Sequence, residues 1–172
     1  MIMKKRYVVC ICLVGILLLF SFLVLQLSAV NSPPDLEEVQ LIFDNYREDI
    51  LLIASFLIDS GYDNIYISDS SGQVKADFVD LAISDDRVCH AIDHLLTEGT
   101  FIEISKLGGT ISLLQWTGPR DIGCGVLYSA NVEESIDQEW LTELTPLSDA
   151  HWFSYVSDYN AWRNGKRASL PG

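Results

Sequence analysis

The sequence predicts an α+β fold: an N-terminal transmembrane helix followed by one small domain with an antiparallel sheet packed by two main helices. Three observations lead to this prediction. A long apolar segment comes first, two segments with helical spacing follow, and the remaining apolar residues alternate with polar ones, as in strands. We divide the chain into a cytoplasmic basic tail (1–6), a transmembrane signal-anchor (7–30), a linker (31–35), an extracytoplasmic domain (36–162) and a flexible basic tail (163–172).

The apolar segment, residues 7–30, contains no charged side chain. As a helix it would be roughly 36 Å long, at about 1.5 Å per residue, and so could cross a hydrocarbon core about 30 Å thick. Lys4–Arg6 precede it, and basic residues beside a span stay in the cytoplasm, so we expect the domain to lie outside the cell membrane. The alternative is a cleaved signal peptide, but cleavage after Ala29 would place Leu27 where a small residue is preferred.

The domain after the apolar segment is strongly acidic. The net charge of the chain is −13, and all 24 acidic residues lie at Asp35 or later. Nucleic-acid binding depends on Lys and Arg that neutralise phosphates, so this composition excludes a nucleic-acid partner. We expect the lipid bilayer to be the partner of residues 7–30, and an envelope protein, a peptide or a glycan to be the partner of the domain. No cofactor is predicted.

The first helix of the domain is predicted over residues 35–59, with Ser32 as the N-cap, Pro33 at its first position and Gly61 beyond its end. Its apolar residues follow alternating spacings of three and four. They are Leu36, Val39, Phe43, Tyr46, Ile50, Ile53 and Leu57. We interpret this stripe as the face that packs on the sheet, because further apolar residues widen it. The alternative is a coiled-coil seam that joins two copies.

The rest of the domain reads as strands with one more helix. We predict a helix from Ser84 to Glu98, and a hairpin about Gly108–Gly109 in which Ile104 faces Leu113 and Phe101 faces Trp116. Strands are predicted over residues 64–68, the first half of 74–83, 122–130 and 150–158, and a short helix or loop over 135–144.

The segment CHAIDHL, residues 89–95, and Asp86 just before it carry the candidate zinc ligands. Asp86, His90 and His94 recur every four residues on the polar side of the predicted helix. Zinc typically needs three or four ligands held by second-shell partners, and the Glu of the zinc-protease signature is missing here. We therefore interpret the three residues as a solvated helix face and predict no metal.

Two cysteines lie outside the apolar segment. Cys89 and Cys124 could form one disulfide in an oxidising compartment, or remain two free thiols. Cys124 lies between two glycines and could act as a nucleophile with His151 or His94 as its base. No helix N-terminus follows Cys124 to support a thiolate.

The C-terminal segment is rich in aromatic residues, and Trp152, Tyr155 and Trp162 are the candidate ligand-binding residues. Tyr and Trp combine a large apolar surface with a polar tip, as glycan- and peptide-binding surfaces require. Cross-strand packing of the same rings is the alternative.

The absence of a catalytic motif favours a single-pass membrane-anchored protein with a non-catalytic interaction or ligand-binding domain. One alternative is a membrane-anchored thiol enzyme or hydrolase that uses Cys124 with a histidine. Another is a structural or sensory ectodomain that dimerises through the stripe from Leu36 to Leu57.

Overall fold

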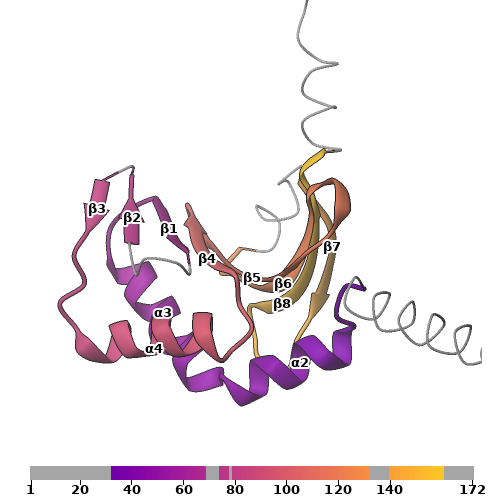
Figure 1. The fold of residues 1–172 in the computed structure, drawn as a ribbon, viewed down its shortest axis with the longest axis horizontal. Coiled ribbons are helices and arrows are strands. Elements are labelled where there is room, and N and C mark those ends of the chain that lie inside the picture. The colour runs from indigo at the N-terminus through magenta and orange to yellow at the C-terminus, as the bar shows by residue number, and fades with distance from the viewer. Residues whose placement is uncertain (1–31, 69–73, 78, 132–139, 161–172) are drawn as a thin grey trace, which may run out of the picture. The chain divides into compact units, whose positions relative to one another are not determined.

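The computed structural model describes residues 32–68, 74–77, 79–131 and 140–160. Within them the fold is α+β, with three α-helices along one face of an eight-stranded antiparallel sheet, as Figure 1 shows. The predicted signal-anchor, residues 7–30, lies outside the described residues. None of the helices in the described ranges is long and apolar enough to cross a membrane.

The predicted helix over residues 35–59 is two helices, α2 (Leu36–Asn45) and α3 (Arg47–Asp59), separated at Tyr46. The expected Ser32 N-cap is also wrong. Asp35 caps α2 by accepting from the Glu38 backbone N–H at 2.9 Å, and the Glu38 carboxylate accepts in return from the Asp35 N–H at 3.2 Å. The break changes the direction of the chain, so that α2 contacts β6 and β8 of the sheet whereas α3 packs against α4.

Helix α4 (Asp86–Thr97) confirms the second predicted helix. The Asp85 side chain caps it by accepting from the Arg87 backbone N–H at 2.9 Å. Its apolar side is buried, whereas Cys89 and His90 are exposed. The buried residues are Val88, Ala91, Ile92 and Leu95.

The sheet has the strand order β3-β2-β1-β4-β5-β6-β8-β7, so β3 and β7 are its edges. Its strands are β1 (Asn64–Ser68), β2 (Val74–Ala76), β3 (Val79–Leu81), β4 (Glu103–Leu107), β5 (Thr110–Thr117), β6 (Ile122–Ser129), β7 (Leu141–Pro146) and β8 (Trp152–Asp158), with a short 3₁₀ turn, η1 (Pro119–Asp121), before β6. The strands at the β5–β8 end curl away from the helices (Figure 1).

The predicted hairpin is β4–β5, and Ile104 faces Leu113 as expected. Gly108 has a φ of +56°, which suits glycine in this turn. The expected pairing of Phe101 with Trp116 is wrong, because the β4–β5 ladder ends at Glu103 and Leu114. Phe101 lies before β4 and is buried in the core, 2% exposed.

Strands β3 and β7 were not predicted. Within residues 74–83, β2 confirms the strand predicted for the first half, and a second short strand, β3, follows it. Residues 141–146 form β7 where a helix or loop was expected, and this strand pairs with β8. Leu141 and Leu144 of β7 pack against the cluster that contains Phe153 and Tyr155, which gives this strand an apolar contact with the sheet.

The main core lies between the helices and one face of the sheet. The stripe predicted from its spacing contributes Val39, Phe43, Ile50, Ile53 and Leu57 to this core. These side chains are at most 1% exposed, so the helix-on-sheet interpretation is confirmed and the stripe is not available as a coiled-coil seam. A smaller cluster, Leu127, Phe153 and Tyr155, lies on the opposite face of the sheet.

Candidate functional site

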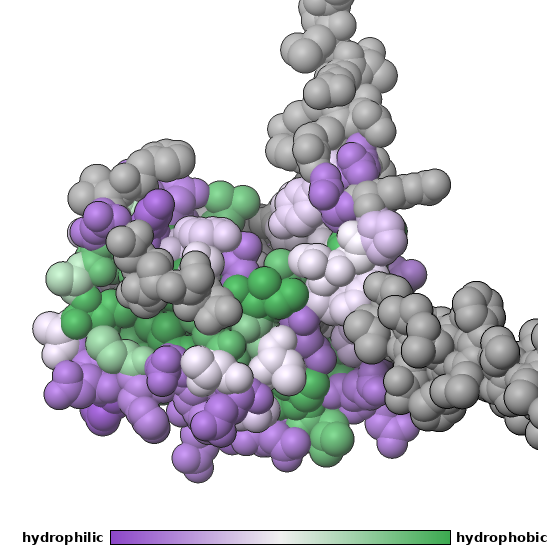
Figure 2. Space-filling view, viewed as in Figure 1, coloured by the Kyte–Doolittle hydropathy of each residue, from purple (hydrophilic) through white to green (hydrophobic). Residues whose placement is uncertain are grey.

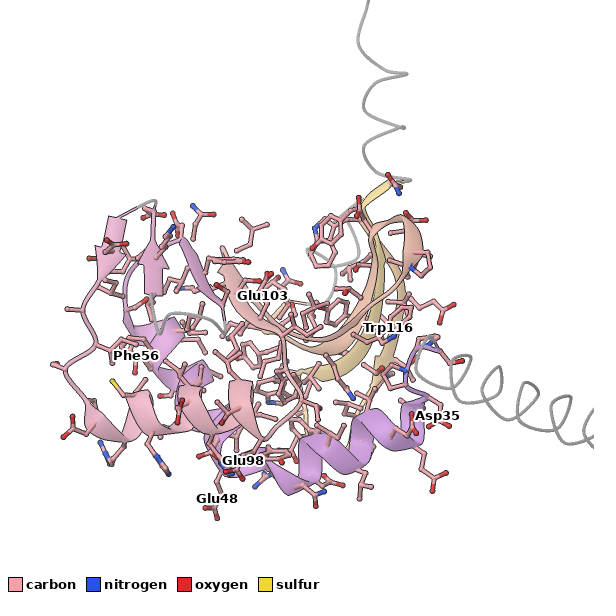
Figure 3. The ribbon with its side chains drawn as sticks, viewed as in Figure 1. Asp35, Glu48, Phe56, Glu98, Glu103 and Trp116 are labelled. Carbon is pink, nitrogen blue, oxygen red and sulfur yellow. The ribbon has the colours of Figure 1, made fainter. Side chains whose placement is uncertain are left out.

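The face of the sheet away from the helices carries a cluster of polar side chains. In β1 and β4, Ile65, Ile67 and Ile104 point into the main core. Alternation therefore places Tyr66 and Glu103 on the opposite face, and Figure 3 shows Glu103 there, whereas Glu48 and Glu98 point outward from the helix layer.

The register brings three strands together at this point. Tyr66 of β1 is paired with Ser105 of β4, and Ser105 is paired with Ser112 of β5. We call Tyr66, Glu103, Ser105, Ser112 and Tyr155 the Glu103 cluster.

Glu103 is the acidic member of the Glu103 cluster and is partly buried. Burial raises its pKa, because removing a carboxylate from water penalises the charged form, while hydrogen bonds from Tyr66 and Ser105 oppose the rise. Burial, followed by the charge of Glu103, raises the pKa of Tyr66, so this phenol stays protonated and donates its hydrogen bond to the carboxylate.

A chain of hydroxyl groups extends from Glu103 across the sheet. Ser105 Oγ lies 2.8 Å from Ser112 Oγ, and the Tyr155 hydroxyl hydrogen bonds Ser112. Each hydroxyl has one hydrogen to donate. Ser105 donates to Glu103, and either hydroxyl can be the donor between Ser105 and Ser112. The Glu103 carboxylate, which accepts from Tyr66 and Ser105, is the negative end of this chain.

Aromatic rings continue this face beyond the Glu103 cluster. The ring of Trp140 is stacked on Tyr159, with centroids 5.5 Å apart and an interplanar angle of 7°, and meets Tyr155 edge-on at 6.2 Å. We call Trp140, Tyr155 and Tyr159 the aromatic row. Burial raises the pKa of Tyr159, and the charge of Glu103 adds to the rise, so the row lies within the electrostatic field of that carboxylate.

This arrangement offers hydrogen-bond acceptors, one negative charge and aromatic faces. Those are the groups that recognise a positively charged ligand. Within the described ranges, no group of three His, Cys, Asp or Glu side chains is placed to hold a metal ion.

The histidines of CHAIDHL lie on α4, away from the Glu103 cluster. His94 Nδ1 lies 2.6 Å from Asp49 Oδ2 of α3, and His94 Nε2 lies 3.6 Å from Glu98 Oε2. The His90 ring stacks on His94 with centroids 6.2 Å apart, and Asp86 is exposed at the start of the helix. Both nitrogens of His94 therefore face carboxylates, and its pairing joins α4 to α3.

This pairing predicts a pH-dependent stability. The Asp49 hydrogen bond raises the pKa of His94 above its ordinary value of 6.5, with smaller contributions from Glu98 and Asp93. The stabilisation is therefore complete below about pH 6.5 and is lost as the pH rises through the raised value. For residues 32–172 we expect the urea midpoint to fall between about pH 6 and about pH 8, and His94→Gln to abolish that fall.

The matched control for this experiment is His90→Gln, which removes an exposed histidine one turn away and should keep the pH dependence. An equal loss of pH dependence in both variants would contradict a specific role of the His94–Asp49 pair.

Both described cysteines are free thiols, Cys89 exposed on α4 and Cys124 buried in β6. Of the two arrangements considered from the sequence, the structure thus has two free thiols instead of a disulfide. Burial raises the pKa of Cys124 to about 11, which disfavours a reactive thiolate.

The two histidines considered as bases are not beside Cys124. Cys124 is paired with Val156 of β8, whereas His151 precedes that strand, roughly 17 Å away at about 3.3 Å per residue. His94 faces Asp49. The structure does not assemble the predicted pair of Cys124 and a histidine.

Cys89 lines a groove of about 280 Å³ between α4 and strands β2 and β3. Most of its walls are apolar, and Figure 2 shows an apolar band on the surface above α4. The apolar lining residues are Val74, Leu81, Ala82, Ile83, Ile92 and Leu96.

The predicted aromatic residues do not form one exposed surface. Trp152 points into the main core, with its ring 5.3 Å from Phe43, whereas Tyr155 belongs to the cluster on the opposite face. Each is 3% exposed. Trp162 lies outside the described residues. Cross-strand packing occurs between Trp152 and Tyr128, whose centroids are 5.2 Å apart.

Of the Glu103 cluster, sequence reasoning named only Tyr155. A usable signal exists in the alternation of the three predicted strands, since NIYIS, FIEISK and TISLLQW each have one apolar and one polar side. Aligning the polar sides would have placed Tyr66, Glu103 and Ser112 on one face. The order of the strands in the sheet was the missing information.

No family model matches the chain, and the searches of curated proteins and of solved structures found no match either.

Proposed function

We propose that this chain is a single-pass membrane-anchored protein whose α+β domain lies outside the cytoplasm and binds a partner polypeptide without turning it over. The observation that carries the proposal is the Glu103 cluster on the face of the sheet that the helices leave open. Tyr66, 44% exposed, connects this cluster to the surface. The uncharged segment of residues 7–30 supports the anchor.

The alternative of a thiol enzyme is less well supported by the same structure. Nucleophilic catalysis needs an activated thiolate with a base within hydrogen-bond reach. Cys124 instead has a pKa raised to about 11 by burial, and it pairs with Val156 instead of lying beside a histidine. The Glu103 cluster consists of one carboxylate and hydrogen-bonded hydroxyl groups, which suit the binding of a polar or charged ligand.

Site-specific crosslinking in intact cells tests the proposed function. We would place a photoreactive benzoylphenylalanine at position 66, on the open face, and in a second variant at position 48. Glu48 is exposed on α3, in the helix layer. We expect a crosslinked polypeptide from position 66 and none from position 48, because only the open face binds the partner.

Crosslinking from neither position, or equally from both, would contradict binding through the open face. The same cells report on the anchor. Full-length protein should remain with the membranes after an alkaline carbonate wash, and its recovery in the soluble fraction would overturn the membrane-anchored topology.

A further inference from the structure

The Glu103 carboxylate has capacity for a further partner. A carboxylate has about four lone-pair sites, and the hydroxyls of Tyr66 and Ser105 occupy two of them. No Lys, Arg or His in the part of the chain that the structure describes forms an ion pair with Glu103; the ion pairs there involve Asp49, Asp85, Glu98 and Asp149. Glu103 is thus a partly buried negative charge with acceptor sites to spare.

Two exposed tyrosines, Tyr66 and Tyr159, lie within the electrostatic field of this charge. Tyr66 is 44% exposed and is hydrogen bonded to Glu103, and Tyr159, 39% exposed, is stacked on Trp140. The negative face of an aromatic ring attracts a cation within about 6 Å of its centroid. A carboxylate beside such rings therefore favours a cationic group with flat faces over a neutral or anionic one.

The charge of the whole domain acts in the same direction. All 24 acidic residues of the chain lie at Asp35 or later, so the domain attracts basic partners and repels acidic ones. Long-range attraction brings a basic partner to the domain, and Glu103 supplies a partly buried acid beside Tyr66.

We propose that Glu103, with the ring of Tyr66 and the aromatic row, binds an arginine side chain of the partner polypeptide. This inference rests on the proposed function, because it names the group that the open face recognises. Arginine fits better than lysine for two reasons. Its planar guanidinium stacks on aromatic rings, and it presents its donors in a fork that matches a carboxylate. Its weaker hydration also lowers the cost of entering a partly buried site.

The test uses the full-length protein in detergent micelles and a blocked pentapeptide, Gly-Ser-Arg-Ser-Gly. Shifts of the tyrosine-ring and tryptophan-indole NMR signals report binding. Two matched peptides carry citrulline, which is neutral but has nearly the shape of arginine, or lysine. We expect saturable shifts with the arginine peptide, and affinity at least about tenfold lower for citrulline because the charge-assisted hydrogen bonds are lost.

The protein variants test whether binding depends on the Glu103 carboxylate or only on the net negative charge of the domain. Glu103→Gln keeps the shape of the side chain and should weaken arginine-peptide binding by about tenfold. Glu143→Gln, at an exposed acid on β7, changes the net charge equally and should bind like the wild type. Tyr66→Phe keeps the ring and should retain most of the affinity, whereas Tyr66→Ser should lose it.

Unchanged binding by the Glu103→Gln variant, or equal binding of the arginine and citrulline peptides, would overturn the arginine assignment. Equal binding of the lysine peptide would overturn the preference for a guanidinium. Cellular crosslinking from position 66 distinguishes the two proposals: crosslinks that persist in Glu103→Gln leave the open face as the binding surface and remove only the arginine. Absence of crosslinks in the wild type removes the proposed function itself.

Discussion

Replacing Phe43 with alanine should destabilise the domain by about 3–5 kcal/mol, the range observed when a large buried aromatic residue is truncated. Phe43 is completely buried, and its ring lies 5.3 Å from that of Trp152, where α2 meets β8. Truncation would leave a cavity between the two layers that neither the helix nor the curved sheet can close. Urea unfolding of residues 32–172, followed by circular dichroism, measures the loss.

The matched control is Leu41→Ala, two residues earlier on the same helix. Leu41 is 60% exposed, so its truncation should change the free energy of unfolding by less than about 0.5 kcal/mol. Similar losses from the two variants would show that α2 does not pack on the sheet as described.

A methyl group at Gly125 should be nearly as damaging, at about 3 kcal/mol, the upper part of the usual range for overpacking. A Cβ at this position would lie 2.0 Å from the carbonyl oxygen of Leu113 and 2.9 Å from the backbone nitrogen of Gln115. The clash involves the backbone of β5 at its irregularity after Leu114, so no side-chain rotation can relieve it. The strand pair β5–β6 would have to separate locally.

Gly109→Ala provides the comparison, because a Cβ there meets nothing within 4 Å. Restricting the unfolded chain at this open position should leave stability unchanged or raise it by up to about 1 kcal/mol. The same urea experiment measures both variants. A Gly125→Ala domain as stable as the wild type would contradict the close approach of β5 and β6.

The fold could be predicted where the apolar period is uninterrupted. Helix α4 and strands β1, β6 and β8 follow directly from periods of 3.6 and 2. The break at Tyr46 could not be predicted in this way, since the stripe continues through it. The two helices on either side of the break contact different elements, α2 the strands β6 and β8 and α3 the helix α4, and these contacts lie far away in the sequence.

Strand β7 could not be predicted from the spacing of its own apolar residues. Leu141 and Leu144 are three residues apart, a spacing typical of a helix, yet both pack on the same side of the sheet. The register of β7 against β8 shifts between Leu141 and Glu143, and this shift changes the alternation of the strand. An irregularity of this kind is set by the neighbouring strand and leaves no period in the sequence.

The candidate site was harder to predict from the sequence than the strands were. Aromatic density drew attention to Trp152 and Tyr155, which lie on opposite faces of the sheet. Glu103 comes close to Tyr66 and Ser112 only because β1, β4 and β5 are adjacent. Which strands become neighbours depends on contacts between distant parts of the chain, so spacing within one segment could not reveal this cluster.

The two edges of the sheet have a consequence for crowded copies of the chain. Strand β3 has only three residues, and β7 combines a register shift, the exposed charge of Glu143 and the missing N–H of Pro146. Each of these features opposes hydrogen bonding by a strand from another molecule. The domain should therefore resist polymerising into fibres even where many copies are concentrated in a small volume.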